Sequence, residues 1–118
     1  MDKKMSYEEF SYRINEPITN EYGKSPITPV LSMLEGKWKA KVIYAIMCLK
    51  DASFSQLERF CDGISPAALN SVLKELVSNG LIIKKTKAAK SINYSLTSKG
   101  EDLMPVFYEI MNWGLNYK

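Results

Sequence analysis

Residues 62–80 read DGISPAALNSVLKELVSNG, and this stretch decides the fold. Ser65 followed by Pro66 is a strong signal for a helix start, because the hydroxyl can accept from a free backbone amide and proline lacks the amide that the first turn leaves unpaired. Asn79 and Gly80 are typical of a helix end. Between these signals, apolar residues recur with the spacing of one helical face: Leu69, Val72, Leu73, Leu76 and Val77. The stretch therefore predicts an amphipathic helix directly after a tight turn.

A shorter helix is expected before this turn. Ser55-Gln56-Leu57-Glu58 has the pattern of a capping box, in which the serine and the residue three positions later satisfy each other's backbone amides. Leu57, Phe60 and Cys61 supply the inner face of this helix. Residues 50–54, just before it, are expected to be partly extended. Two helices joined by a short turn that contains glycine predict a helix-turn-helix motif.

The N-terminal half predicts three further helices. A short helix capped by Ser6 is expected to reach about Ile14. Residues 15–29 contain one glycine and three prolines, too many breakers for a regular element, and predict a connector. A helix is expected from residue 27 or 28 to 35, and a longer one over residues 38–49, because both stretches have apolar residues at helical spacing.

From residue 81 onward the apolar pattern changes. Residues 81–83 and 92–96 are rich in β-favouring side chains and predict two antiparallel strands around a basic loop. Thr97 is expected to cap a last helix, in which Pro105 introduces a kink or loosens the first turns. Two apolar stripes run along this helix: Leu103, Val106, Phe107, Ile110, Trp113 and Gly114 in one, and Met104, Tyr108, Met111 and Leu115 in the other. We expect the first stripe to pack on the core and the second on another copy of the chain.

The charge of the chain is concentrated in one segment. The whole chain has 16 basic and 13 acidic residues, a net charge of only +3. Residues 81–100 contain five lysines and no acidic residue: Lys84, Lys85, Lys87, Lys90 and Lys99. This local excess is the pattern expected of a hairpin that contacts phosphates. A solvated surface is the alternative, since basic runs are often only soluble faces.

The composition argues against an enzyme. There is no histidine and there are only two cysteines, which removes the commonest general base and leaves too few ligands for a tetrahedral metal site. No phosphate-binding glycine loop is present. We therefore expect no cofactor. The sequence shows no leader and no apolar run long enough to cross a membrane, so a soluble cytoplasmic protein is expected. A length of 118 residues predicts a single domain.

The helix over residues 66–78 has the side chains needed to read duplex DNA. The face opposite its apolar stripe carries small or hydrogen-bonding residues: Ala67, Asn70, Ser71, Lys74 and Ser78. Asparagine can pair with an adenine edge, serine can bond to several bases, and alanine can contact a thymine methyl group. A helix-turn-helix followed by a basic hairpin favours duplex DNA as the partner. The alternative is a winged helix that binds an acidic protein.

Short motifs along the chain resemble the HxlR-type regulators, which are bacterial winged helix-turn-helix transcription factors related to the MarR group. The motifs are Leu34-Glu35-Gly36-Lys37-Trp38, Phe54-Ser55-Gln56-Leu57, Gly63-Ile64-Ser65, Leu73-Lys74-Glu75-Leu76, Gly80-Leu81-Ile82 and Tyr94-Ser95-Leu96-Thr97-Ser98-Lys99-Gly100. The resemblance covers about residues 25–114. It implies a homodimer whose recognition helices enter successive major grooves of a pseudo-palindromic operator, with half-sites roughly 34 Å apart or a multiple of that turn.

The resemblance also implies how the chain is divided. We expect a mainly α-helical fold with a small β-hairpin wing over residues 1–118. Residues 1–24 would be an N-terminal arm, residues 25–96 the DNA-binding core and wing, and residues 97–118 a dimerisation helix. The expected DNA-binding residues are Ser65, Pro66, Ala67, Asn70, Ser71 and Lys74 on the recognition helix, and Lys84, Lys85, Lys87, Lys90, Lys37 and Gln56 on the wing and backbone-contacting segments. The expected dimer contacts are Phe10, Ile14, Met104, Tyr108, Met111 and Leu115.

The chain also departs from the HxlR pattern. Relatives commonly have a cysteine where this chain has Ser25, and in several of them that thiol senses electrophiles or oxidants. A serine cannot form a thiolate, so thiol sensing there is not expected. Cys48 and Cys61 are expected to be inert core residues, and Trp38 is expected to be a core anchor. Aromatic residues of the terminal helices could instead line a cavity for an unknown small-molecule effector, although interface packing is the more common role: Tyr7, Phe10, Tyr12, Tyr108, Trp113 and Tyr117.

Overall fold

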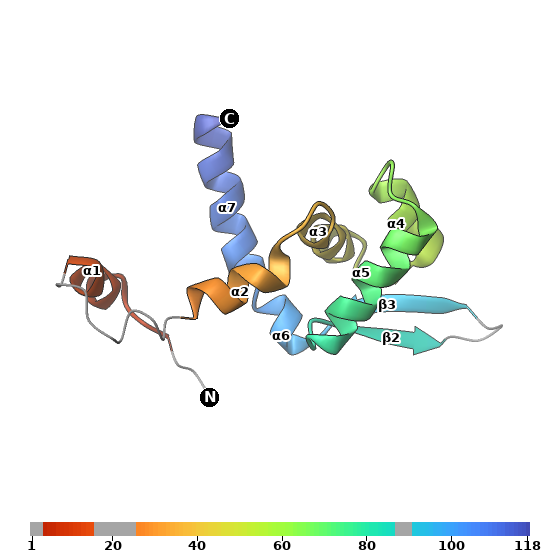
Figure 1. Ribbon diagram of the computed structural model, residues 1–118, viewed down its shortest axis with the longest axis horizontal. Coiled ribbons are helices and arrows are strands. Elements are labelled where there is room, and N and C mark those ends of the chain that lie inside the picture. The colour runs from red at the N-terminus through yellow and green to blue at the C-terminus, as the bar shows by residue number, and fades with distance from the viewer. Residues whose placement is uncertain (1–3, 16–25, 87–90) are drawn as a thin grey trace.

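The computed structural model describes residues 4–15, 26–86 and 91–118 (Figure 1). Most of the elements are helices, and the strands form one small sheet. In chain order the elements are α1 (Tyr7–Asn15), α2 (Ile27–Leu34), α3 (Lys39–Leu49), β1 (Ala52–Ser53), α4 (Phe54–Phe60), α5 (Pro66–Ser78), β2 (Ile82–Thr86), β3 (Ile92–Leu96), α6 (Ser98–Glu101) and α7 (Met104–Tyr117). The predicted fold class is confirmed. Residues 16–25 of the predicted connector lie outside the described residues.

The core lies where α3, α4 and α5 pack against the sheet. Its fully buried side chains come from every one of these elements: Val42, Ile43, Ile46, Leu57, Leu69, Leu73, Leu76, Leu81 and Ile82. Trp38 is half-buried against this cluster, which confirms its predicted role as an anchor. Since each buried aliphatic side chain contributes about 1.5–3 kcal/mol, this cluster is the main source of stability.

The sheet has three antiparallel strands in the order β1-β3-β2. The hairpin formed by β2 and β3 confirms the prediction, although β2 continues to Thr86 rather than ending at Ile83. The remaining strand, β1, is short and pairs with β3, with Ala52 opposite Tyr94 and Ser53 opposite Asn93. This pairing ties the start of α4 to the hairpin.

The predicted capping box of α4 is displaced by two residues. The N-cap is Ser53 and not Ser55, because Ser53 Oγ accepts from the backbone amide of Gln56 at 3.2 Å, while Gln56 Oε1 accepts from the backbone amide of Ser53 at 2.9 Å. Ser53 belongs to β1, so the sheet fixes where the helix begins.

The C-terminal segment forms two helices where the sequence predicts one. Thr97 caps α6, since its hydroxyl accepts from the backbone amide of Gly100 at 3.0 Å. The helix then breaks, and α7 starts at Met104 with Pro105 in its first turn, a position that tolerates a missing amide. The expected disturbance at Pro105 is confirmed as this break.

The packing of α7 differs from the expectation. Leu103 and Phe107 contact the core cluster, but no residue of α7 is buried. Val106, Ile110 and Trp113, which were expected to pack inward, are exposed by 45%, 59% and 63%. The prediction was wrong for these three residues because a helix that touches its own domain along one narrow line leaves both flanks uncovered.

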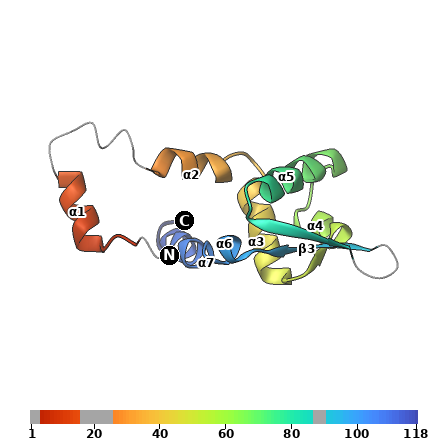
Figure 2. The same cartoon turned by 90° about the horizontal axis from the view of Figure 1, so that it is seen from below.

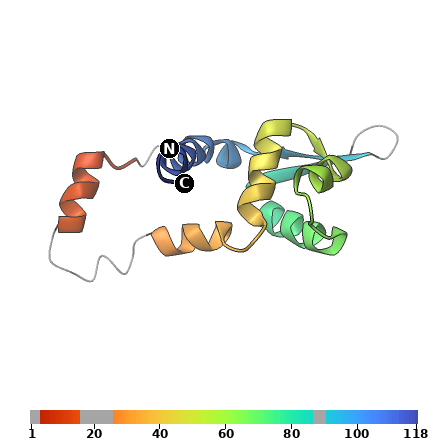
Figure 3. The same ribbon diagram turned by 90° about the horizontal axis from the view of Figure 1, so that it is seen from above.

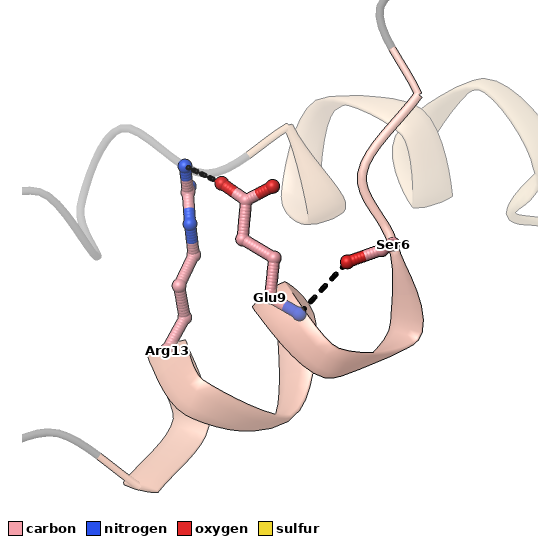
Figure 4. A network of polar contacts seen from close by, with 3 residues as sticks. All are labelled: Ser6, Glu9 and Arg13. Carbon is pink, nitrogen blue, oxygen red and sulfur yellow. Dashed lines mark hydrogen bonds and ion pairs between the residues drawn. The ribbon is translucent and has the colours of Figure 1, made fainter.

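The first helix, α1, lies apart from the rest of the protein (Figures 2 and 3). Ser6 Oγ accepts from the backbone amide of Glu9 at 3.0 Å, which confirms the predicted cap. The Glu9 carboxylate accepts from the Arg13 guanidinium at 3.2 Å, one turn later on the helix (Figure 4). No residue of α1 is buried, and its apolar side chains are exposed.

Candidate nucleic-acid interface

The start of α5 is fixed by its own sequence. Gly63 has a φ of +94°, a conformation that side-chain-bearing residues rarely adopt, and it forms the turn that follows α4. Ser65 Oγ then accepts from the backbone amide of Ala68 at 3.0 Å, and Pro66 is the first helical residue. The predicted helix start is confirmed. No acidic residue lies in the first turn, so the positive end of the helix dipole is uncompensated there.

The two faces of α5 are divided as its sequence predicts. Leu69, Leu73 and Leu76 are buried in the core, and Val72 packs against it. The prediction was wrong for Val77 of the same stripe, which is 40% exposed near the end of the helix. The opposite face is exposed and contains each of the residues expected to contact bases: Ser65, Pro66, Ala67, Asn70, Ser71 and Lys74. The exposed polar face of α5 is therefore about four turns long, and an α-helix has the width that fits a DNA major groove.

The end of α5 is held by the segment that leads into α6. Thr97 Oγ1 donates to the carbonyl of Gly80 at 2.6 Å, and Lys99 Nζ donates to the carbonyl of Asn79 at 2.8 Å. Lys99 was counted among the basic residues of the hairpin, but its ammonium is used to cap the helix. This contact joins residues 20 positions apart, and the local charge pattern contains no signal for it.

The described lysines of the hairpin lie on opposite faces of the sheet. Lys84 pairs with Tyr94 and Lys85 with Asn93 across the β2–β3 ladder. Because side chains alternate along a strand, the two ammonium groups extend to different sides of the wing. Both residues are exposed. Lys87 and Lys90, also expected at this site, lie outside the described residues.

Gln56 and Lys37 both have contacts within the domain. The side-chain oxygen of Gln56 is used in the capping box, so the residue predicted to reach DNA has a structural role at the start of α4. The Lys37 ammonium lies 5.1 Å from the centroid of the Trp38 ring. Lys39, two residues later, pairs with Glu75 of α5 at 2.5 Å and links the two helices.

The cysteines differ from each other in exposure. Cys61 is fully buried, as predicted, and its burial raises the pKa of the thiol. The prediction was wrong for Cys48, which is exposed near the end of α3. The Cys48 thiol hydrogen-bonds the Tyr44 phenol and raises the pKa of that phenol. Position 48 is near an apolar stripe but faces away from the core, whereas Ile46 is buried and Met47 and Leu49 pack against the core in the same turn. Ser25 lies outside the described residues.

The residues expected at a dimer interface are all exposed in the single protomer. They are Phe10 (41%), Ile14 (62%), Met104 (47%), Tyr108 (66%), Met111 (46%) and Leu115 (78%). Val30 and Leu31 of α2 are also exposed. Uncovered apolar area on this scale, at one end of the molecule, is typical of a surface that contacts another chain.

Neither a metal-ligand cluster nor a membrane-spanning helix occurs in the described part of the chain. No group of three or more possible metal ligands occurs there, and no helix there has the length and apolar content needed to cross a bilayer. An open hollow of about 290 Å³ lies between α2, α3 and the end of α5, lined by Ser32, Met33, Lys39, Glu75, Ser78 and Asn79. None of the aromatic residues considered for an effector cavity lines it.

A helix-turn-helix on a three-helix core with an attached β-hairpin defines a winged helix-turn-helix protein. The model of the HxlR-like helix-turn-helix family matches residues 33–118, and the chain belongs to this family.

Relatives and solved structures agree with this assignment. The HTH-type transcriptional regulator YdzF of Bacillus subtilis is 32% identical over 94 residues, which cover 78% of this chain and 86% of YdzF. A regulator of the same type from Halalkalibacterium halodurans is 34% identical over 93 residues, which cover 77% of this chain and 82% of that protein. A crystal structure assigned to the MarR family, from Porphyromonas gingivalis, superposes with a TM-score of 0.74 at 30% identity, covering 87% of this chain and all of that one. The chain is thus an HTH-type transcriptional regulator, and the prediction that it is not an enzyme is confirmed.

Proposed function

We propose that this regulator binds duplex DNA sequence-specifically as a homodimer. The observation that carries the proposal is the exposed polar face of α5, which is held at both ends, with the lysine-bearing hairpin beside it. In this proposal residues 25–96 bind DNA, and the arm of residues 1–24 and the helices of residues 97–118 form the dimer. The function would be exercised in the bacterial cytoplasm, where the chromosome lies.

Two features support α5 as the base-reading element. The exposed side chains of its first two turns, among them Ala67, Asn70 and Ser71, are short, so this part of the helix can approach the floor of the groove closely. Its dipole is positive at the end marked by Ser65, which favours phosphates near that end. The partner's α5, related by two-fold symmetry, would read the second half of a pseudo-palindromic operator.

The proposal is tested by selecting bound sites from fragmented genomic DNA and measuring affinity for the selected duplex against random duplex. Specific binding is expected to be at least about 10³-fold tighter than random binding at physiological salt. No binding to any duplex, even at low salt, would contradict the proposal and favour an acidic protein partner.

Replacing Lys85 by Gln is expected to weaken binding to every duplex by a similar factor. Phosphate contacts carry no sequence information, so specific and random DNA should be affected alike. The slope of log affinity against log salt should fall by about 0.9, the contribution of one phosphate contact. Fluorescence anisotropy over a salt series provides the measurement, and an unchanged slope would remove Lys85 from the interface.

Replacing Asn70 by Ala is expected to change sequence preference instead. Loss of one bidentate contact to a base costs about 1–3 kcal/mol of discrimination and should relax selection at one position of each half-site. Asn70 is exposed and outside the core, so the fold should be preserved. Repeating the site selection with the variant tests this role. An unchanged selected sequence with uniformly weaker binding would argue against base reading by Asn70.

A further inference from the structure

Two lysines lie around one tryptophan at the start of α3. The Lys37 ammonium is 5.1 Å and the Lys41 ammonium 5.7 Å from the centroid of the Trp38 ring. The two nitrogens are therefore at most about 11 Å apart. Lys37 and Lys41 are exposed, whereas Lys39 between them is largely buried and paired with Glu75. The sequence thus alternates between a lysine that holds the recognition helix and lysines that remain available for another partner.

The Trp38 ring connects these lysines to the helix-turn-helix turn. The ring carbon Cη2 would lie 3.9 Å from a Cβ built on Gly63, so the indole reaches the turn two residues before the cap of α5. Lys41 also lies close enough to Cys61, at the end of α4, for its charge to offset part of the rise that burial causes in the pKa of that thiol. Both observations place positive charge beside the turn that leads into α5.

The cluster lies at the start of α3, a helix that packs against both α5 and the hairpin strand β3, while α5 packs against β2. Figure 2 shows that α3 begins on the side of the sheet where α5 lies and ends on the other side. Neither α3 nor α5 has an acidic residue of its own in its first turn, and the carboxylate of Glu75, which pairs with the first turn of α3, is bound there to Lys39.

We propose that Lys37, Trp38 and Lys41 form a second phosphate-binding site that contacts the DNA backbone beside the turn that leads into α5. The proposal rests on the proposed DNA binding and adds a specific site to it. The indole face holds the lysine side chains near one place, which reduces the conformational freedom lost on binding. Duplex DNA carries one charge per roughly 1.7 Å of its axis, so two cations this close together can meet more than one phosphate.

The test compares Lys41, in the first turn of α3, with Lys50, the residue that caps the end of α3. Lys41→Gln removes the charge at the start of α3, and Lys50→Gln removes a charge from the exposed residue just past its other end, about 12 Å of helix away. Affinity of the full chain for its selected duplex and for random duplex is measured across a salt series. Circular dichroism melting of each variant accompanies these measurements and reports folding.

For Lys41→Gln, the salt slope is expected to fall by about 0.9 on both duplexes, which corresponds to about eightfold weaker binding at 0.1 M salt. The double variant with Lys37→Gln should lose about twice that slope, while Lys50→Gln should keep the wild-type slope. If Lys41→Gln left the salt slope unchanged, even with a lower melting temperature, the phosphate-binding site would be overturned. The proposed DNA binding would still hold in that case, provided that the wild type binds DNA. An equal loss for Lys50→Gln would also overturn the phosphate-binding site, because the effect would then be one of overall charge. Absence of binding by the wild type would overturn the proposed function together with this site.

Discussion

Replacing Tyr108 by Glu is expected to convert the protein to a monomer and to weaken operator binding by at least about 100-fold. Tyr108 is 66% exposed on the flank of α7 that also carries Met104, Met111 and Leu115. If this flank is the dimer interface, the substitution buries an unpaired carboxylate there, which costs several kcal/mol. Because a dimer holds its second recognition helix at a millimolar effective concentration, a monomer loses a factor of about 10²–10⁴ in affinity.

Asn116→Glu provides the matched control for this prediction. It adds the same charge to the same helix, at an exposed position on the polar side that also carries Glu109 and Asn112. Sedimentation velocity and operator titration of both variants should show a monomer with weak binding for Tyr108→Glu and wild-type behaviour for Asn116→Glu. A dimeric Tyr108→Glu protein would move the interface away from this flank.

Local signals were sufficient to predict α5 and its exposed face. Ser65 and Pro66 act within one turn of the helix that they start, and the leucine spacing reports the buried side without knowledge of the partner elements. The hairpin was also predictable, because its strands adjoin in sequence and their residues favour extended structure. The residues proposed to read bases could therefore be predicted from local sequence, without knowledge of contacts between distant parts of the chain.

Predictions that depend on distant contacts were less accurate. Two serines, Ser53 and Ser55, precede α4, and only the pairing of Ser53 with Asn93 in the sheet decides which one caps it. The charge pattern assigns Lys99 to the basic wing, but in the structure its ammonium donates to the carbonyl of Asn79. Cys48 is near an apolar stripe, and its exposure depends on which elements pack beside α3.

The cluster around Trp38 shows the same limit. Lys37 was predicted to approach the DNA backbone from its place in a short motif, whereas Lys41 was not singled out. The sequence shows lysines on both sides of a tryptophan, but this pattern indicates a cluster beside the helix-turn-helix turn only once the Trp38 ring is seen to reach Gly63. Side-chain reach across 25 positions of sequence cannot be inferred from residue spacing alone.

Replacing Gly100 by Ala is expected to destabilise the protein by about 3 kcal/mol or more, at the upper end of what overpacking a core costs. A Cβ on this buried residue would lie 2.1 Å from the carbonyl oxygen of Leu81 and 3.1 Å from Leu96 Cδ2. The Leu81 carbonyl cannot easily move, because it also accepts from the backbone amide of Thr97 at 3.1 Å. The backbone of α6 must therefore shift away from the end of α5.

The melting temperature should fall by about 10 °C or more for a protein of this size. Operator binding should weaken as well, because α6 lies between the recognition helix and α7 in the chain and a shift there moves the two recognition helices of a dimer relative to each other. Gly114→Ala is the control: it makes the same change in α7, where nothing lies within 4 Å of the added carbon, and it should stabilise the helix by about 0.5–1 kcal/mol. If Gly100→Ala melted within about 2 °C of the wild type, the close approach of α6 to Leu81 would not be a fixed feature of the fold. Opposite shifts for the two glycine variants would show that this contact, and not helix propensity, requires glycine at position 100.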